Sequence, residues 1–266
     1  MDIFQAIILA IIEGITEFLP VSSTGHMALT SAIMGINTEP FTKLYEIVIQ
    51  FGAILSVVVL YWKKFFDFRK ISFYIKLMVA IIPALAFGAL FKDHIEQILE
   101  KPMVIALVLL VGGILLLFVD KWFNKPVYFK DDEITNKHAF FIGLYQVLAI
   151  IFPGLSRSAA TIIGGMQQKL SRPLAAEFSF YLAVPTMLAA TIKSLYDVYK
   201  ETPEVLSTDN LTTLAIGSIT AFIVAILAIR FFISFLQQHG FRLFGWYRII
   251  IGIILLTLIL TGYIKA

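Results

Sequence analysis

Cysteine is absent from all 266 residues of the sequence. This absence excludes disulfide bonds, thiolate metal sites and a cysteine nucleophile. Charge is scarce as well: Asp, Glu, Lys and Arg make up 15% of the chain, whereas 59% of the residues are hydrophobic and the mean hydropathy is +0.88. Soluble domains are nearer half apolar. The composition therefore indicates an integral membrane protein.

Common nucleotide-binding and zinc-protease motifs are also missing. The sequence has no GxGxxG loop, no Walker loop and no HExxH,. The net charge of +3 comes without a basic tract suited to nucleic acid,. The first apolar stretch has neither a basic segment before it nor a cleavage site after it, so we expect it to remain part of the fold.

Apolar runs of about 20 residues, the length that crosses a bilayer as a helix, recur along the chain. They predict an all-α polytopic membrane protein with about six transmembrane helices. Two further apolar segments, 2–36 and 138–170, are each interrupted by polar residues and a proline, which predicts two re-entrant helical hairpins,. The predicted spans are 44–62, 73–91, 102–120, 175–195, 212–236 and 245–264.

Lysine and arginine predict the sidedness of the loops, because cytoplasmic loops are enriched in both. The charges agree only if the first hairpin enters from outside and the second from the cytoplasm, which places both termini outside. The loops assigned to the cytoplasm are 63–76, 121–137 and the one marked by Arg242 and Arg248, and those assigned to the outside are 92–101 and 197–209.

The chain also shows signs of an internal repeat. Pro20 and Pro153 are 133 residues apart, half the chain length, and this offset sets Ser23 against Ser156. Each half has an odd number of crossings, so the second copy is inverted, and the polar turns of inverted repeats face one another near the midplane. We predict a single membrane domain, 1–266, with repeats at about 1–120 and 138–266 joined by the cytoplasmic linker 121–137.

The densest polar stretch in this apolar chain, EGITEFLPVSSTGH, runs from Glu13 to His26. Glu13 and Glu17 are four residues apart, so on a helix they face each other. Two carboxylates at membrane depth are unfavourable unless they share a proton, bind a cation or meet an arginine. After Pro20 come three residues suited to cap a second helix near Gly25, whose free N–H groups would bind an anion. These three are Ser22, Ser23 and Thr24.

The second polar break places Arg157 between Ser156 and Ser158 at an expected helix start, which suits a bidentate phosphate contact,. Structural alternatives stand beside these interpretations. The serines could be helix caps, Arg157 could neutralise a glutamate, and His26 could be a core imidazole. A purely structural scaffold would leave the paired glutamates beside a hydroxyl-rich turn unexplained, so we favour a functional site.

The segment EGITEFLPVSSTGH, with PGLSRS at 153–158, closely resembles the motifs of the undecaprenyl-diphosphatase family, and the resemblance runs nearly end to end. It implies a bacterial cytoplasmic-membrane enzyme that hydrolyses undecaprenyl diphosphate to undecaprenyl phosphate and inorganic phosphate, recycling the carrier lipid of cell-wall synthesis. The residues that match the family's motifs are Glu13, Glu17, Ser22, Ser23, Thr24, His26, Ser156, Arg157 and Ser158.

The resemblance and the chemistry of these residues together suggest roles. Glu13 and Glu17 would hold a divalent cation, Mg or Ca, or handle protons. Ser23, His26 or water would attack phosphorus, and we favour Ser23 with His26 moving the proton. The expected catalytic residues are Glu13, Glu17, Ser23, His26 and Arg157, and the expected phosphate-binding residues are Ser22, Thr24, Ser156, Arg157 and Ser158.

A transporter or flippase for a polyprenyl phosphate lipid is the alternative function, because inverted repeats are also the architecture of secondary transporters. The paired acids and the imidazole lie only in the first repeat, which favours an enzyme. We expect a polyprenyl diphosphate lipid as substrate, contact with the bilayer, no nucleic acid, and an active site open to the extracytoplasmic side. A homodimer is left open.

Overall fold

The computed structural model describes residues 1–91 and 101–264. The regular elements in that part of the chain are helices, apart from an isolated bridge between Tyr128 and Leu170. They are α1 (Ile3–Thr16), α2 (Ser23–Ile33), α3 (Pro40–Leu60), α4 (Trp62–Phe65), α5 (Ile71–Leu90), α7 (Pro102–Trp122), η1 (Asp131–Glu133), α8 (Asn136–Ile151), α9 (Arg157–Gln167), α10 (Arg172–Glu201), η2 (Pro203–Leu206), α11 (Thr208–His239) and α12 (Arg242–Leu260).

Six of the described helices are long and apolar enough to cross a membrane: α3, α5, α7, α10, α11 and α12. Each coincides with one predicted span, which confirms the number and order of the spans. α10 and α11 have 30 and 32 residues and extend beyond the predicted 175–195 and 212–236. At 1.5 Å per residue they are about 45 Å long, more than the hydrocarbon thickness of about 30 Å, so hydropathy marks only their apolar middle.

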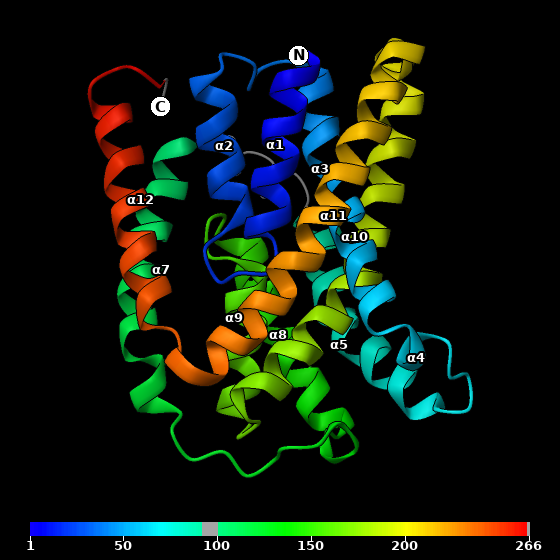
Figure 1. Cartoon of the computed structure of the whole chain (residues 1–266), viewed down its shortest axis with the longest axis vertical. Coiled ribbons are helices and arrows are strands. Elements are labelled where there is room, and N and C mark those ends of the chain that lie inside the picture. The colour runs from blue at the N-terminus through cyan, green and yellow to red at the C-terminus, as the bar shows by residue number, and fades with distance from the viewer. Residues whose placement is uncertain (92–100, 265–266) are drawn as a thin grey trace.

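Four shorter helices form the two predicted hairpins. α1 and α2 have 14 and 11 residues, and α8 and α9 have 16 and 11, so none of the four reaches across a bilayer,. In Figure 1, α1 and α2 enter from the end of the molecule where the chain starts, α8 and α9 enter from the opposite end, and their turns lie near the middle. The broken segments 2–36 and 138–170 are therefore confirmed.

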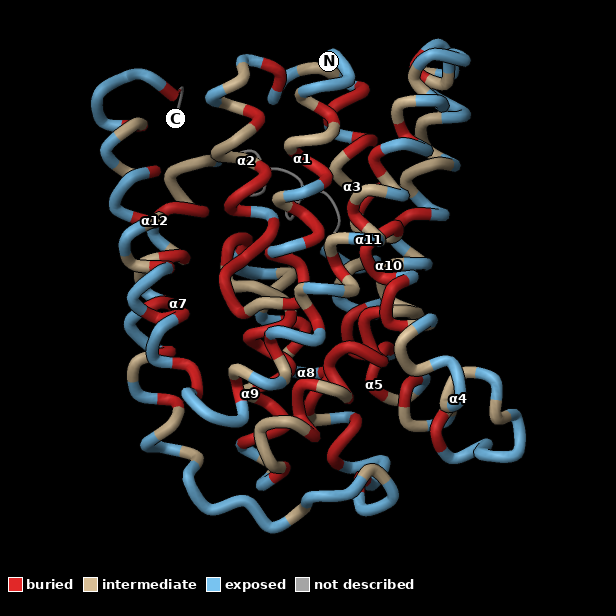
Figure 2. Tube along the Cα trace, in the orientation of Figure 1, coloured by how far each residue is buried: buried red, intermediate tan, exposed pale blue. Residues whose placement is uncertain are grey.

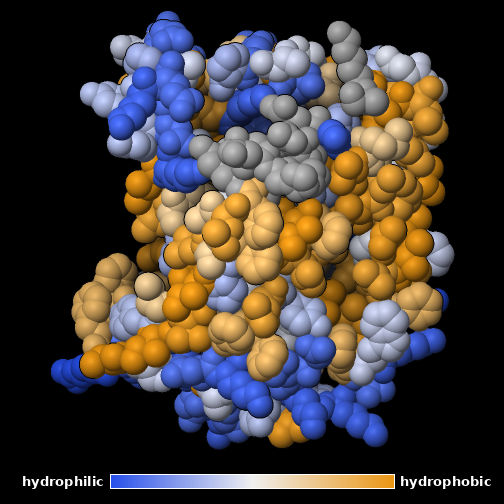
Figure 3. All heavy atoms as spheres, turned by 180° about the vertical axis from the view of Figure 1, so that it is seen from behind, coloured by the Kyte–Doolittle hydropathy of each residue, from blue (hydrophilic) through white to orange (hydrophobic). Residues whose placement is uncertain are grey.

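The outer surface is the apolar belt of a multi-pass membrane protein. On the face seen in Figure 3, hydrophobic side chains cover the middle of the molecule and hydrophilic ones gather at both ends. The outward faces of α7 and α12 are exposed in Figure 2, whereas the hairpin turns are buried. Exposed large side chains on these two helices include Leu107, Val111, Ile250 and Ile253. Such a belt is stable when lipid covers it.

Small residues let the spanning helices pack closely. A Cβ added to Gly113 of α7 would lie 2.9 Å from the carbonyl oxygen of Gly245 in α12, and one added to Gly52 of α3 would lie 2.7 Å from the carbonyl oxygen of Ser218 in α11. Both distances are shorter than real Cβ contacts. Close backbone approach of this kind is how helices associate in lipid, where no hydrophobic effect drives them together.

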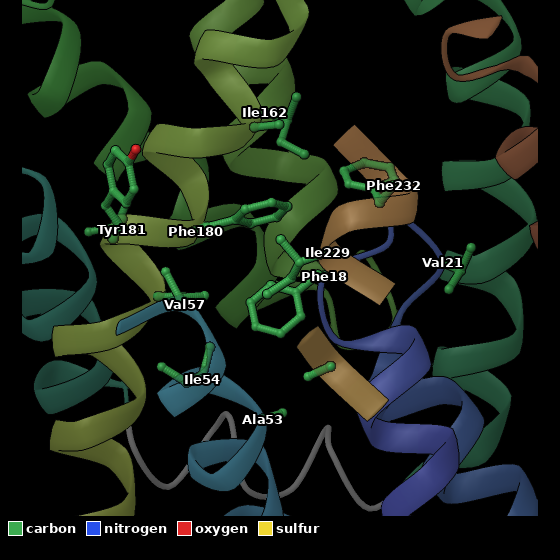
Figure 4. Packing of buried hydrophobic residues seen from close by; sticks show 14 of the residues in the cluster. Phe18, Val21, Ala53, Ile54, Val57, Ile162, Phe180, Tyr181, Ile229 and Phe232 are labelled. Atoms are coloured by element: carbon green, nitrogen blue, oxygen red, sulfur yellow. The ribbon is translucent and has the colours of Figure 1, made fainter. Parts of the chain in front are cut away.

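Phe18 anchors the turn of the first hairpin in the core. Its ring is fully buried and meets Phe180 of α10 edge to face, with centroids 5.1 Å apart. Phe180 in turn contacts Phe232 of α11, and Figure 4 shows the three rings gathered beside Ile229. Because Phe18 directly follows Glu17, this packing also restrains the position of the Glu17 carboxylate.

The predicted sidedness needs one correction. Arg248 lies inside α12 and is 0% exposed, so it marks no loop, and Arg242 alone carries that assignment. The loop count treats every arginine near an expected boundary as solvated, which hides an arginine inside the membrane. The predicted outer loop 92–101 lies almost entirely outside the described residues. The division into repeats 1–120 and 138–266 stays a prediction, although the opposed hairpins in Figure 1 are consistent with it.

Candidate active site

Both hairpins turn on a serine with the same unusual backbone. Ser22 and Ser156 each have φ 73°, a left-handed value that is strained for a residue other than glycine and that clusters at functional sites,. Each hydroxyl caps the next helix, accepting from the amide of Gly25 at 3.2 Å or of Ala159 at 3.3 Å. Because both serines are helix caps, Ser156 corresponds to Ser22. The proline offset had aligned Ser156 with Ser23, and it was wrong by one residue because the second turn has one more residue between its proline and its cap.

The two turns touch each other directly. The Ser158 hydroxyl lies 2.9 Å from the Leu19 carbonyl oxygen, to which it donates, and 2.9 Å from the hydroxyl oxygen of Ser156. The start of a helix leaves amide groups without intrahelical acceptors and carries a positive partial charge. The first turns of α2 and α9 thus bring two sets of free amides to one place, a common arrangement for binding an anion.

A cavity of about 180 Å³ lies where the hairpins meet. It is lined by polar groups from both hairpins and by side chains of α3 and α10. The lining includes six of the predicted site residues, whereas Glu13, His26 and Ser158 lie outside it. The lining residues are Glu17, Ser22, Ser23, Thr24, Gln50, Gln146, Ala149, Ile150, Pro153, Gly154, Ser156, Arg157, Thr186 and Met187.

Glu17 connects Ser23 and Arg157 at this cavity. Its Oε1 accepts from Arg157 Nη2 at 2.7 Å, and its Oε2 accepts from the Ser23 hydroxyl at 2.6 Å. The side chains of Glu17 and Arg157 are only 6% and 10% exposed, so the charges are paired out of water. A carboxylate that holds both a hydroxyl and a guanidinium can take the proton of the one and orient the other.

One of the donors of Arg157 is unpaired in the described structure. Nη1 donates to the carbonyl oxygen of Ser179 at 3.2 Å and Nη2 donates to Glu17, while Nε is buried and has no partner in the described part of the chain. An unpaired buried donor is costly. Since Arg157 lines the cavity, an oxyanion bound there could satisfy Nε.

His26 does not contact Ser23 through a hydrogen bond in the described structure. Its Nδ1 donates to the Ser22 carbonyl oxygen at 2.8 Å, which leaves Nε2 of the neutral ring to accept from the Tyr247 hydroxyl at 2.8 Å,. The two rings stack, with an interplanar angle of 2°. The predicted serine–histidine contact is therefore replaced by a serine–glutamate contact, because the helix turns the imidazole toward α12.

Glu13 is fully buried one helical turn before Glu17. Neither carboxylate oxygen accepts a hydrogen bond from a donor among the described residues. The Glu17 carboxyl group lies close enough to share a proton with Glu13, and Glu46 and Arg157 are also near. Orphaned carboxylate oxygens at this depth need a proton or a cation. No group of three or more His, Asp or Glu side chains able to hold a metal occurs in residues 1–91 and 101–264.

Several polar residues at this site were not predicted. Gln146 and Thr186 line the cavity, and their side chains lie 3.4 Å apart, Nε2 to Oγ1. The repeat offset aligns Gln146 with Glu13, which was a usable signal. Tyr247 and Arg248, which approach from α12, had no local signal because they lie more than 200 residues from the first turn.

These features define a class: an all-helical multi-pass membrane protein with a polar intramembrane cavity where two broken hairpins meet. The chain belongs to the family described as bacitracin resistance protein BacA, whose model matches residues 6–254.

Curated relatives named undecaprenyl-diphosphatase are similar to the chain over nearly its whole length. The one from Flavobacterium johnsoniae is 59% identical over 259 residues, covering 97% of this chain and 96% of the relative. The one from Porphyromonas gingivalis (strain W83) is 51% identical over 278 residues, covering 98% of each. The one from Campylobacter jejuni is 43% identical over 269 residues, covering 100% of this chain and 98% of the relative.

The buried pair yields a stability prediction. Glu17→Gln alone and Arg157→Gln alone should each destabilise the protein by about 3–5 kcal/mol, because each leaves an uncompensated buried charge. The double variant should recover part of this loss, since no charge then remains unpaired. Thermal unfolding in detergent measures all three, with the exposed Glu204→Gln as control. A double variant that loses the sum of the single effects would contradict the pairing.

Proposed function

We propose that this protein hydrolyses undecaprenyl diphosphate to undecaprenyl phosphate and inorganic phosphate. The observation that carries the proposal is the run of contacts from Ser23 through Glu17 to Arg157 at the edge of a polar cavity. It joins a nucleophile, a proton acceptor and an anion-binding group within hydrogen-bond distance. The names of relatives at 43–59% identity support the same reaction.

The diphosphate would bind where the two helix starts meet. The donors that we assign to it are the free amides of α2 and α9, the hydroxyls of Thr24 and Ser156, and Nε of Arg157. These donors are fixed before substrate arrives, so little reorganisation opposes the charge that develops in the transition state. Ser22 and Ser158 support the phosphate indirectly, Ser22 by capping α2 and Ser158 by tying the two turns together.

In the first chemical step, Ser23 Oγ attacks the terminal phosphorus and Glu17 Oε2 takes the hydroxyl proton. The bond from that phosphorus to the bridging oxygen breaks, and undecaprenyl phosphate leaves with the bond's electron pair. Arg157 balances the charge on the phosphoryl oxygens. In the second step, water attacks the phosphoserine, releasing inorganic phosphate, and a proton returns to Ser23. We assign the proton transfer to Glu17 and not to His26, because Glu17 holds the hydroxyl.

Glu13 and Glu17 also suit a divalent cation. Mg²⁺ is commonly held by one or two carboxylates together with substrate phosphates, which matches two acidic residues and a diphosphate. The oxygens of Glu13, which accept no hydrogen bond from the described residues, fit this donor set, whereas each oxygen of Glu17 already accepts one. Bound there, Mg or Ca would supply charge neutralisation for the phosphates.

We further propose that the protein resides in the bacterial cytoplasmic membrane, with the cavity facing the extracytoplasmic side. The loop charges support this orientation, since 63–76 and 121–137 hold the densest basic residues,. A homodimer stays a prediction. No observation on the described residues favours the transporter alternative over hydrolysis.

Phosphate release from undecaprenyl diphosphate by the detergent-purified protein tests the reaction. Arg157→Ala should lower kcat about 100-fold or more, because it removes charge stabilisation of the transition state. The exposed Arg230→Ala serves as control. Chelator should abolish release, and Mg or Ca should restore it. Wild-type protein that releases no phosphate would refute the enzyme, and release unaffected by chelator would refute the cation.

Sidedness can be read from single cysteines in the cysteine-free chain. Asn37→Cys, between α2 and α3, should react with a membrane-impermeant maleimide in intact cells. Asn124→Cys, which follows α7, should react only after permeabilisation. Both residues are exposed. The reverse labelling pattern would invert the proposed orientation.

The nucleophile can be identified from a trapped phosphoenzyme. We expect an acid-stable label that disappears in Ser23→Ala, because phosphoserine survives acid whereas phosphohistidine does not. An acid-labile label lost in His26→Ala but kept in Ser23→Ala would make His26 the nucleophile. Absence of label under quench conditions that trap a known phosphoserine enzyme would favour direct attack by water.

A further inference from the structure

Arg248 is a fully buried cation bound to the main chain of both turns. Nη1 donates to the carbonyl oxygens of Leu155 at 2.7 Å and Pro20 at 3.3 Å, and Nη2 donates to those of Gly154 at 2.8 Å and Val108 at 3.4 Å. All four acceptors are neutral main-chain carbonyls. The residue is 0% exposed.

Burial of an arginine with no carboxylate partner is expensive unless its donors are satisfied. The carbonyls of an interrupted helix have the opposite requirement, because in lipid they need a donor from elsewhere in the protein. Arg248 meets both needs through Nη1 and Nη2, while its Nε has no partner among the described residues. Its planar guanidinium presents several donors in a fixed geometry, so one side chain can join three turn carbonyls from two hairpins.

We propose that Arg248 is a positioning residue that holds the two phosphate-binding turns in register from the side of α12. Pro20 belongs to the turn that leads into Ser22 and Ser23, and Leu155 directly precedes Ser156. A shift of either carbonyl therefore moves the nucleophile or the anion-binding amides. The inference rests on the proposed function and adds a residue that is not itself part of the cavity lining, although it binds the main chain of the lining residue Gly154.

The neighbouring helix leaves room for this guanidinium. A Cβ added at Gly112 of α7 would collide with Nη2 of Arg248 and lie 2.9 Å from its Cζ. Glycine at this position therefore allows the guanidinium to lie between α7 and the two turns. Gly112→Ala should displace the guanidinium without changing any charge. Gly88→Ala on α5 is the matched control, because nothing lies within 4 Å of its added Cβ.

The competing explanation is that Arg248 acts only through its positive charge near the phosphates. Arg248→Lys separates the two, because lysine keeps the charge but offers a single ammonium in place of a fork. If the main-chain contacts matter, Arg248→Lys behaves like Arg248→Met. If only charge matters, Arg248→Lys retains activity. Arg242→Met, an exposed change on the same helix, controls for loss of a basic residue.

The test measures phosphate release from undecaprenyl diphosphate, with kcat and KM determined separately, for wild type and these variants. We expect kcat to fall about 100-fold in Arg248→Lys and Arg248→Met, since misplacement of about 1 Å has effects of this size. KM should change less than kcat, because misplacement of the reacting groups acts chiefly on the transition state. Gly112→Ala should lower kcat in the same way and less severely, while both controls resemble wild type.

The double variant Gly112→Ala with Arg248→Met completes the design. Its kcat should match that of Arg248→Met alone, because both changes act on the same guanidinium. Three results would each overturn the inference while leaving the proposed function standing. They are a kcat in the double variant that falls by the product of the two single effects, a wild-type kcat in Gly112→Ala, and a near wild-type kcat in Arg248→Lys. Wild-type protein without phosphate release would instead refute the proposed function and this inference with it.

Discussion

The need to satisfy backbone polar groups inside the membrane governs this structure. Each hairpin interrupts a helix at membrane depth, where water is not available to bind the freed groups. The protein meets the requirement internally: serine hydroxyls cap the new helices, Ser158 donates to Leu19, and Arg248 donates to carbonyls of both turns. The irregular backbone that results is also what exposes amides to the cavity.

Charge pairing follows from the same geometry. Once both turns are held together, Glu17 Oε1 and Arg157 Nη2 lie 2.7 Å apart, although the two residues come from opposite halves of the chain. Neither charge would be tolerable alone at this depth. Their pairing at the cavity leaves Glu17 Oε2 to accept from Ser23, and it leaves Arg157 Nε without a partner in the described part of the chain. The same two side chains therefore serve the stability of the fold, through their ion pair, and the proposed chemistry, through Glu17 Oε2 and Arg157 Nε.

Sequence patterns predicted the spans and the broken hairpins because hydropathy and proline report directly on membrane depth and helix interruption. They also predicted six of the residues that line the cavity, all of them polar, because polar groups in an apolar chain are conspicuous. The partner of Ser23 and the environment of His26 were beyond reach, since both depend on how α2 is rotated about its axis. Arg248 was misassigned because composition near a helix end does not distinguish a solvated arginine from a buried one.

The wide separation of Glu17 and Arg157 along the chain bears on biosynthesis. Arg157 is made 140 residues after Glu17, a delay of roughly 7 to 28 seconds at ordinary translation rates. Through that interval Glu17 lacks the counter-ion that it has in the folded protein, so its carboxylate must remain hydrated or protonated,. Arg248 emerges later still, from the final helix. The two turns therefore acquire their full set of contacts only when the last helix has been made.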